Sequence, residues 1–239
     1  MNHGVNSMRR DGRVAGLIYL VVVLSGMFCL AYVPSQLGRG ISAAAAHAGL
    51  FRAGIAAFLL MQVAFALLPL ALYRLFADVD RRAATLMVVL ALTSVPIGLV
   101  AVTHRIEALT LLDGAGIRTA DAATAFALAI QRYGTGIHIA SLFWGLWLLP
   151  LGWLVLRSAR LPRLLGVLLM LGGAGYVVEV FGSLLPGIAA ASWFGYVLLP
   201  AAMGEIGTCL WLLAFGASPG RIAVPARARG TDAFDGMER

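Results

Sequence analysis

Charge is what this sequence has least of. Only 12% of its 239 residues are charged, and all 18 basic residues are arginine, since the chain contains no lysine. We attribute the missing lysine to coding bias rather than to recognition chemistry. Hydrophobic residues make up 61% of the chain, and the mean hydropathy is +0.90. So few charges among so many apolar residues indicate an integral membrane protein.

Cysteine is also scarce, and the familiar catalytic and metal-binding motifs are missing. Cys29 and Cys209 both fall inside apolar stretches, where a free thiol behaves as a small hydrophobe. The sequence has no HExxH, GxSxG or CxxC motif and no glycine-rich phosphate loop after a strand. It also has no histidine pair at metal or haem spacing. We therefore expect no metal and no cofactor.

What the sequence does contain is long apolar stretches. A helix needs about 20 apolar residues to cross the hydrocarbon core of a bilayer. Six stretches meet this requirement, at residues 14–35, 50–76, 83–103, 133–156, 164–185 and 192–215. They predict an all-α, polytopic membrane protein built as a six-transmembrane-helix bundle. The first stretch is too long for a signal peptide and ends in no small-residue cleavage site, so we expect an uncleaved span.

The six stretches leave room for one domain. We predict a polar, frayed N-terminal tail over residues 1–12, a membrane domain over 13–216 and a disordered cytoplasmic tail over 217–239. The longest connection, residues 104–132, includes the amphipathic segment DAATAFALAIQR, which either lies in the interface or extends the fourth span. Pro96 predicts a kink in the third span.

Glycines of the fifth span predict a central helix that its neighbours approach closely, because small residues let membrane helices pack tightly. These glycines are Gly166, Gly172, Gly173, Gly175 and Gly182.

The arginines predict the orientation, because cytoplasmic flanks of membrane spans carry an excess of Lys and Arg. One side of the predicted membrane would hold Arg9, Arg10, Arg13, Arg74, Arg81, Arg82, Arg157, Arg160, Arg163, Arg221, Arg227, Arg229 and Arg239. The other side would hold Arg39, Arg52, Arg105, Arg118 and Arg132. We therefore expect both termini in the cytoplasm. The net charge of +7 is then a topology signal, and we expect no nucleic-acid partner.

Three ionisable side chains inside the spans are the candidates for catalysis: Glu205, His138 and Glu179. An ionisable group at the centre of the hydrocarbon costs about 2.5–3.5 kcal/mol on insertion scales, so it marks either a functional site or a structural hydrogen bond. Neighbours three and four positions away are mostly small or hydroxylated, which turns all three toward the bundle interior. The helical rise places His138 about 8 Å, Glu179 about 10 Å and Glu205 about 20 Å below the outer surface.

These residues suggest a polar track that descends from the outer face. Arg52 would stand at the rim with His104, Arg105 and Glu107, and the candidate ligand-binding residues are Arg52, Gln62, His138, Glu179 and Glu205. The competing interpretation is that the buried polar groups hold helices together and that Arg52 snorkels to the interface. Trp144, Trp147 and Trp211 lie deep enough either to line a cavity or to pack.

Several segments resemble a bacterial membrane family known as domain of unknown function 4386. They are RVAGLIYL at 13–20, HAGLFRAG at 47–54, LYRL at 72–75, FWGL at 143–146, LPRLLG at 161–166, Gly204 with Glu205, and LWLL at 210–213. The resemblance covers about residues 12–216 and implies a six-helix bundle in a bacterial cytoplasmic membrane. It places His47, Arg52, His138 and Glu205 on motif positions, does not match Glu179, and brings no activity with it.

Two classes of function fit these observations. The first is a membrane protein that binds a lipid-like molecule, such as an isoprenoid, quinone or fatty-acyl compound, in an intramembrane polar pocket. If such a protein is an enzyme, Glu205 would be a general acid or base, and His138 and Arg52 would position a lipid or polyprenyl substrate. The second is a non-catalytic accessory or structural membrane protein, or a small transporter, whose only certain partners are membrane lipids.

Overall fold

The computed structural model describes residues 2–37, 40–113 and 120–217. This part of the chain consists of helices and turns and contains no strand. Within it, six helical segments are long and apolar enough to cross a membrane: Ser7–Leu37, Ala48–Phe76, Arg81–Leu112, Asp121–Ser158, Arg163–Ser183 and Phe194–Phe215. Each overlaps one of the predicted stretches, so the predicted all-α, six-span fold is confirmed.

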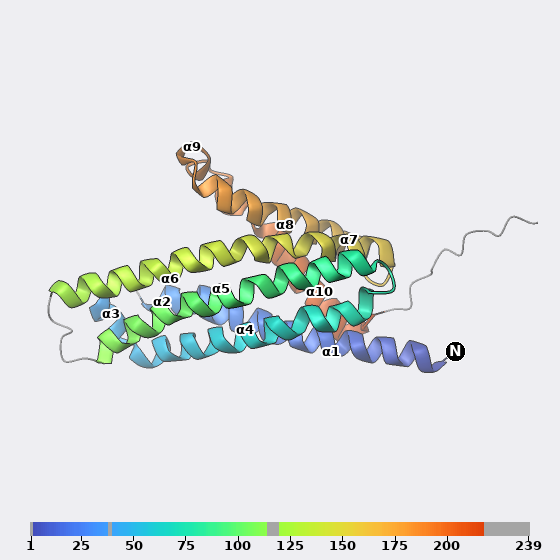
Figure 1. Ribbon diagram of the computed structural model, residues 1–239, viewed down its shortest axis with the longest axis horizontal. Coiled ribbons are helices and arrows are strands. Elements are labelled where there is room, and N and C mark those ends of the chain that lie inside the picture. Colours follow the sequence, from blue (N-terminus) through green and yellow to red (C-terminus); the bar gives the residue numbers. More distant parts are fainter. Residues whose placement is uncertain (1, 38–39, 114–119, 218–239) are drawn as a thin grey trace, which may run out of the picture.

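The order of the described helices can be followed in Figure 1. Helix α1 (Asn2–Gly26) continues through the π-helical turn η1 (Met27–Tyr32) into α2 (Val33–Leu37), and the short α3 (Ile41–Ala46) precedes α4 (Ala48–Phe76). The remaining elements are α5 (Arg81–Asp113), α6 (Ala120–Leu146), α7 (Leu148–Ser158), α8 (Arg163–Ser183), α9 (Pro186–Ala189), the 3-10 turn η2 (Phe194–Tyr196) and α10 (Leu199–Phe215).

Three local predictions can be compared with this structure. The N-terminal segment predicted to be frayed is helical from Asn2, and it is held by packing of Gly12 against Gly216 and the buried Ala217. The amphipathic segment at 121–132 extends the fourth span as part of α6. Helix α5 runs through Pro96 without a break. The predicted tail beyond residue 217 lies outside the described residues.

The membrane helices form a closed ring. Helix α1 contacts α4, α4 contacts α5, and α5 contacts both α6 and α7. Helix α8 contacts α6, α7 and α10, and α10 returns to α1. Glycines make the last contact close, because a Cβ added to Gly16 would come within 2.8 Å of the Leu213 nitrogen. The described ends of the first and last spans therefore share one end of the bundle, called here the terminal end.

Glycines on α8 allow it to lie between α6–α7 and α10. A Cβ on Gly173 would lie 2.7 Å from the carbonyl oxygen of Gly145 in α6, and one on Gly166 would lie 2.9 Å from that of Gly152 in α7. On the other face, a Cβ on Gly172 would lie 2.7 Å from the Cβ of Ala201 in α10. The predicted close approach of neighbouring helices is confirmed, but α8 is not the central helix that was predicted, because it is among the least buried of the six spans.

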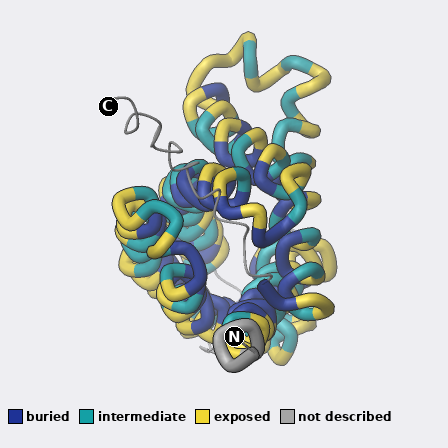
Figure 2. The backbone as a smooth tube through the Cα atoms, turned by 90° about the vertical axis from the view of Figure 1, so that its right-hand side faces the viewer, coloured by how far each residue is buried: buried dark blue, intermediate teal, exposed yellow. Residues whose placement is uncertain are grey.

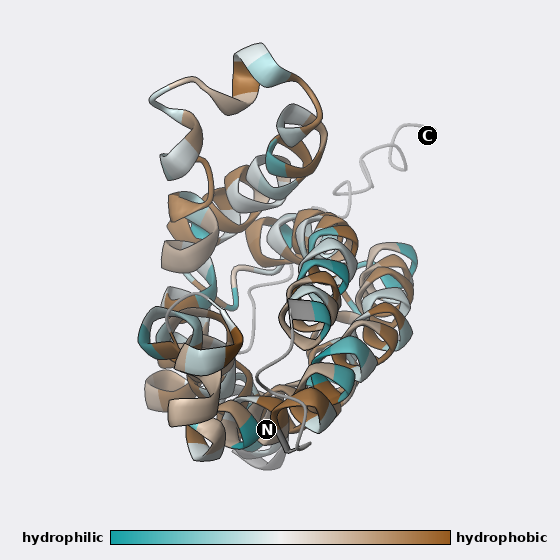
Figure 3. Cartoon of the chain, turned by 90° about the vertical axis from the view of Figure 1, so that its left-hand side faces the viewer, coloured by the Kyte–Doolittle hydropathy of each residue, from teal (hydrophilic) through white to brown (hydrophobic). Residues whose placement is uncertain are grey.

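Burial is confined to the inside of the ring, as Figure 2 shows. Large hydrophobic side chains also stay exposed on the outside, among them Leu17, Leu60, Val100 and Leu164, and Figure 3 shows hydrophobic residues around the bundle. A water-soluble monomer rarely exposes so much contiguous apolar surface. In a bilayer the same surface meets hydrocarbon at no cost.

Two turns at the terminal end are tied together by an ion pair. The buried Arg160, after α7, donates to Asp78 in the α4–α5 turn, with an Nη1 to Oδ1 distance of 2.8 Å and a second bond from Nη2 to Oδ2. This hydrogen bond lowers the pKa of Asp78. Asp80 accepts bonds from the backbone nitrogens of Ala83 and Arg82, which cap α5 and lower the pKa of Asp80.

The long helices exceed the hydrocarbon core. Helix α5 has 33 residues, so it extends about 50 Å at 1.5 Å per residue, against a core of about 30 Å. Helix α8 has 21 residues and extends about 32 Å. Helix α5 is therefore longer than the hydrocarbon core is thick, whereas the length of α8 matches it.

Candidate functional site

The ring encloses a pocket with a volume of about 260 Å³. Helices α1, α4, α6, α8 and α10 and the turn η1 all contribute to its wall. The lining residues are Tyr19, Val22, Val23, Gly26, Met27, Leu30, Met61, Phe65, Trp144, Tyr176, Leu198, Ala202, Glu205 and Ile206. Glu205 is the one carboxyl group in this largely apolar lining, so it is the feature that can give the pocket polar selectivity.

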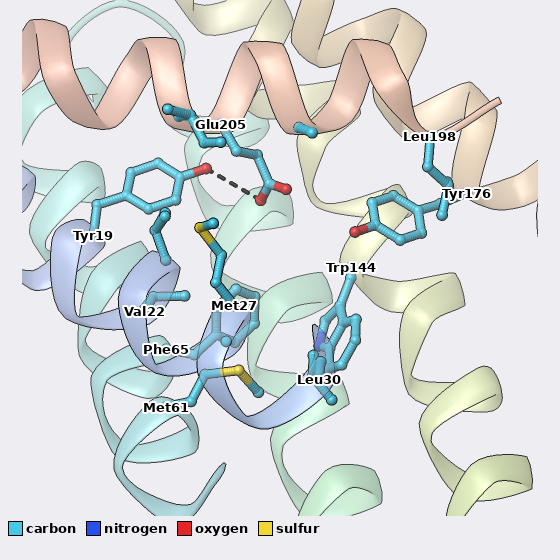
Figure 4. Close-up of a pocket in the computed structure, with 14 residues that line it drawn as sticks. Tyr19, Val22, Met27, Leu30, Met61, Phe65, Trp144, Tyr176, Leu198 and Glu205 are labelled. Atoms are coloured by element: carbon cyan, nitrogen blue, oxygen red, sulfur yellow. Dashed lines mark hydrogen bonds between the residues drawn. The ribbon is translucent and has the colours of Figure 1, made fainter. Parts of the chain in front are cut away.

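Glu205 is held by a tyrosine from the opposite end of the chain. The hydroxyl of Tyr19 on α1 donates to Glu205 Oε1 on α10 at 3.2 Å. Figure 4 shows the Tyr176 ring on the other side of the pocket, with its hydroxyl pointing inward. Tyr19 is fully buried between Glu205 and Trp147, whose ring centroid lies 6.3 Å away. The carboxyl therefore has a hydrogen-bond partner inside a largely apolar pocket.

Glu205 lies well inside α10, away from both ends of the helix. Glu205 lies ten residues before Phe215, which ends α10, and this corresponds to about 15 Å. The expected depth of about 20 Å assumed an unbroken helix from Ser192, whereas α10 begins at Leu199, only six residues before Glu205.

The pocket opens between η1 and α10. Of its lining residues, Met27 on η1 is 57% exposed and Ile206 on α10 is 38% exposed, and Ala202 on α10 is exposed as well. Helices α1 and α10 touch at Gly16 near the terminal end, so the opening lies farther along both helices. Both edges of the opening belong to spans of high hydropathy. A molecule entering here would come from the side of the bundle.

His138 and Glu179 form a separate cluster on α6 and α8. His138 Nδ1 lies 3.5 Å from Glu179 Oε1, and His138 Nε2 lies 2.9 Å from the hydroxyl oxygen of Ser183. Glu179 and Ser183 are four positions apart and so share one face of α8. The sequence placed His138 and Glu179 on one polar track at similar depths, but it did not show that their helices are neighbours and it gave Ser183 no role.

The other predicted residues lie elsewhere. Gln62 is buried and donates from Nε2 to the carbonyl oxygen of Val95 at 3.1 Å, which fastens α4 to α5 beside Pro96. Arg52 is exposed near the start of α4. Of the five candidate ligand-binding residues, only Glu205 is among the described residues that line the pocket. The predicted single polar track is therefore not observed. Glu205 pairs with Tyr19, His138 pairs with Glu179, and Gln62 bonds to the backbone of Val95.

Arg105 is a residue whose placement the sequence did not reveal. The sequence put it at an exposed rim, yet its side chain is 3% exposed and lies 5.1 Å from the ring centroids of both Phe51 and Tyr133. Its Nη1 is 3.5 Å from the carbonyl oxygen of Cys29 in η1. Arg105 belongs to α5, and its three contacts come from η1, α4 and α6. Spacing along the sequence could not show that these elements meet.

Sequence reasoning also missed most of the pocket wall. Tyr19 and Tyr176 were not singled out as site residues, although both have polar hydroxyls inside apolar spans. Among the deep tryptophans, Trp144 lines the pocket, whereas Trp147 is a fully buried core residue and Trp211 packs on Phe215. A search for tyrosines at mid-span would have found Tyr176, near the middle of the stretch 164–185, but not Tyr19.

The comparisons with known proteins give a family but no activity. No curated protein and no solved structure matches this chain at a significant level. One family model, described as a domain of unknown function (DUF4386), matches residues 14–216. This range contains the second to sixth membrane spans completely and the first span from residue 14 onward. It also includes Tyr19, Glu205 and the other residues that line the pocket. The chain is a multi-pass membrane protein that belongs to the DUF4386 family.

Proposed function

We propose that this protein binds a lipid-like molecule in the pocket around Glu205. The observation that carries the proposal is a single carboxyl, hydrogen-bonded to Tyr19, inside an apolar pocket that opens sideways between η1 and α10. Small-molecule sites are typically apolar cavities with a few convergent polar groups. A side opening in membrane spans suits a ligand that reaches the protein through the bilayer.

The size and chemistry of the pocket narrow the ligand class. A volume of about 260 Å³ is slightly below the range of about 300–1,000 Å³ typical of complete ligand sites. It therefore accommodates part of a chain, with the remainder passing through the opening past Met27 and Ile206. Glu205 favours a hydrogen-bonding group such as a hydroxyl at the inner end. An isoprenoid alcohol or a fatty-acyl compound has this combination of a long apolar chain and one polar group.

Native mass spectrometry with lipid analysis of the detergent-purified protein tests this proposal. We expect a discrete co-purifying molecule in the wild type, and we expect it to be lost from Glu205→Gln. The control is Glu107→Gln, which changes an exposed carboxyl that pairs with His104. The same bulk phospholipid in all three proteins would contradict the proposal and favour the structural role of Glu205.

A second variant tests the opening and leaves the carboxyl in place. Ala202→Trp puts a large side chain at an exposed pocket-lining position, and we expect it to prevent binding. Ala214→Trp changes another exposed position of α10 and should leave binding intact. Equal ligand content in the two variants would exclude entry between η1 and α10.

We further propose that the terminal end faces the cytoplasm of a bacterial cell, in its cytoplasmic membrane. The support is the arginine excess: Arg74, Arg81, Arg157 and Arg163 all flank spans at this end. C-terminal fusions to a reporter active only in the cytoplasm and to one active only outside it test this orientation. Activity of the external reporter alone would reverse it.

A further inference from the structure

The cluster on α6 and α8 combines a hydroxyl, an imidazole and a carboxylate in sequence. Ser183 Oγ is 2.9 Å from His138 Nε2, and His138 Nδ1 is 3.5 Å from Glu179 Oε1. The imidazole therefore stands between the other two groups and uses a different nitrogen for each. A nucleophile next to a base that is in turn oriented by a third group is the arrangement that activates serine in acyl transfer.

The hydrogen of the Ser183 hydroxyl has two acceptors within reach. One is the carbonyl oxygen of Val180, at 2.8 Å, and the other is His138 Nε2. When His138 carries its proton on Nδ1, facing Glu179, Nε2 is available to accept the hydroxyl proton. The distance of 3.5 Å to Glu179 is longer than an ideal bond, as is common at catalytic sites without substrate.

Exposure distinguishes this cluster from an ordinary clamp between helices. Ser183 is exposed, and the side chains of His138 and Glu179 are 34% and 26% exposed. A clamp gains most when it is buried, because the surrounding dielectric is then low. Here the hydroxyl oxygen can be reached from outside the bundle.

The position of the cluster along the helices indicates the kind of molecule that reaches it. Ser183 ends α8, and 20 residues of helical rise from Arg163 place it about 30 Å from the terminal end, which is the thickness of a hydrocarbon core. A Cβ on Gly182 would lie 2.8 Å from the Phe194 ring, so η2 packs at this level. Trp193 and Tyr196 there are 52% and 68% exposed, as in an interfacial aromatic belt.

We propose that Ser183, His138 and Glu179 form a second site, distinct from the Glu205 pocket, which hydrolyses fatty-acyl esters at the membrane surface. The ester carbonyls of lipids lie at the boundary between headgroups and hydrocarbon, where water is also present. A serine at the end of a membrane span therefore meets both the ester and the water that the reaction consumes.

The steps follow from the order of the groups. Ser183 Oγ bonds to the ester carbonyl carbon while its proton passes to His138 Nε2. The bond between that carbon and the alkoxy oxygen breaks, and His138 returns the proton to the departing alcohol. Water then attacks the acyl-serine with His138 as base, which releases the fatty acid and restores the hydroxyl. Glu179 is a positioning residue that holds the imidazole and stabilises it when protonated.

A fluorophosphonate probe tests the site in the intact detergent-purified protein. We expect covalent labelling of wild-type protein at Ser183, located by mass spectrometry of the labelled peptide. Ser183→Ala should abolish that label and the release of p-nitrophenol from a fatty-acyl p-nitrophenyl ester. The control is Ser35→Ala, because Ser35 also bonds to the carbonyl three residues earlier, that of Tyr32. Wild-type protein that binds no probe at Ser183 would overturn the proposal.

Variants of the other two residues separate catalysis from folding. His138→Gln should lower the labelling rate by about 100-fold or more. Glu179→Gln should lower the maximal labelling rate by about 100-fold or more without changing the probe concentration that gives half of it. Unchanged rates in both variants would overturn the role of the imidazole. Glu107→Gln, which changes an exposed carboxyl outside both sites, should label normally. Ser183, His138 and Glu179 do not line the Glu205 pocket, so failure of the Glu205 proposal leaves this one standing.

Discussion

The hydroxyl of Tyr19 donates to Glu205 Oε1 at 3.2 Å, although the two residues are 186 positions apart in the sequence. This bond joins the first membrane span to the last at the depth of the pocket (Figure 4). Glycine contacts between α1 and α10 close the ring at the terminal end, and the hydrogen bond restrains it one to two turns farther along. The same bond fixes the one carboxyl in the pocket.

Tyr19→Phe should destabilise the protein with almost no change in volume. The variant keeps the buried ring but removes the donor to Glu205, so the free energy of unfolding in detergent should fall by about 1–3 kcal/mol. The matched control is Tyr196→Phe, because Tyr196 is 68% exposed. Equal unfolding midpoints for the two variants would show that the bond contributes nothing.

Gly172→Ala should loosen the contact between α8 and α10. The added methyl would lie 2.6 Å from the Ala201 backbone nitrogen, so one helix must move. We expect a loss of about 1–3 kcal/mol, as for other overpacked cores, measured by thermal unfolding in detergent. Gly187→Ala is the control, because nothing lies within 4 Å of a Cβ at that position. Greater stability of Gly172→Ala than of the control would contradict the close packing.

Arg105→Ala should weaken the end of the bundle near α3. It removes a buried guanidinium from between Phe51 and Tyr133, where each cation–π contact contributes about 0.5–2 kcal/mol. The Cys29 carbonyl also loses its contact with Nη1, so maleimide should label the Cys29 thiol faster. Cys209, which is also buried, serves as the internal reference, and the control variant Arg132→Ala removes an exposed arginine. A Cys29 rate equal to that of wild type would disprove this role.

The ion pair between Asp78 and Arg160 should make stability depend on pH in acid. Arg160 lowers the pKa of Asp78 in the folded state below its ordinary value of 3.8. The ion pair therefore stabilises the folded state fully at pH values above 3.8. That gain disappears as the pH falls through the lowered pKa of the folded state. At pH 7, Asp78→Asn should cost about 1 kcal/mol, since the carboxylate is half-exposed. The difference in unfolding midpoint from wild type should shrink in acid. A constant difference would exclude this linkage.

The membrane spans could be predicted because they depend on local composition. A run of apolar residues such as 50–76 must be helical in a bilayer, where each backbone group needs an internal partner. The ends of the helices were harder to predict, because polar residues continue a helix where a neighbouring helix packs against them. The segment at 121–132 is part of α6, which packs along α5.

The sequence by itself determined the class of protein, the number of spans and the family, because each of these depends on composition and order along the chain. Helical spacing also indicated that Glu205 faces inward. Only the tertiary structure decided which polar groups meet. The ring brings Tyr19 to Glu205 and Ser183 to His138, and it turns Gln62 toward Val95 and encloses Arg105 between two rings. These partners lie on different helices, and the rotation and neighbours of each helix depend on contacts far apart in the sequence.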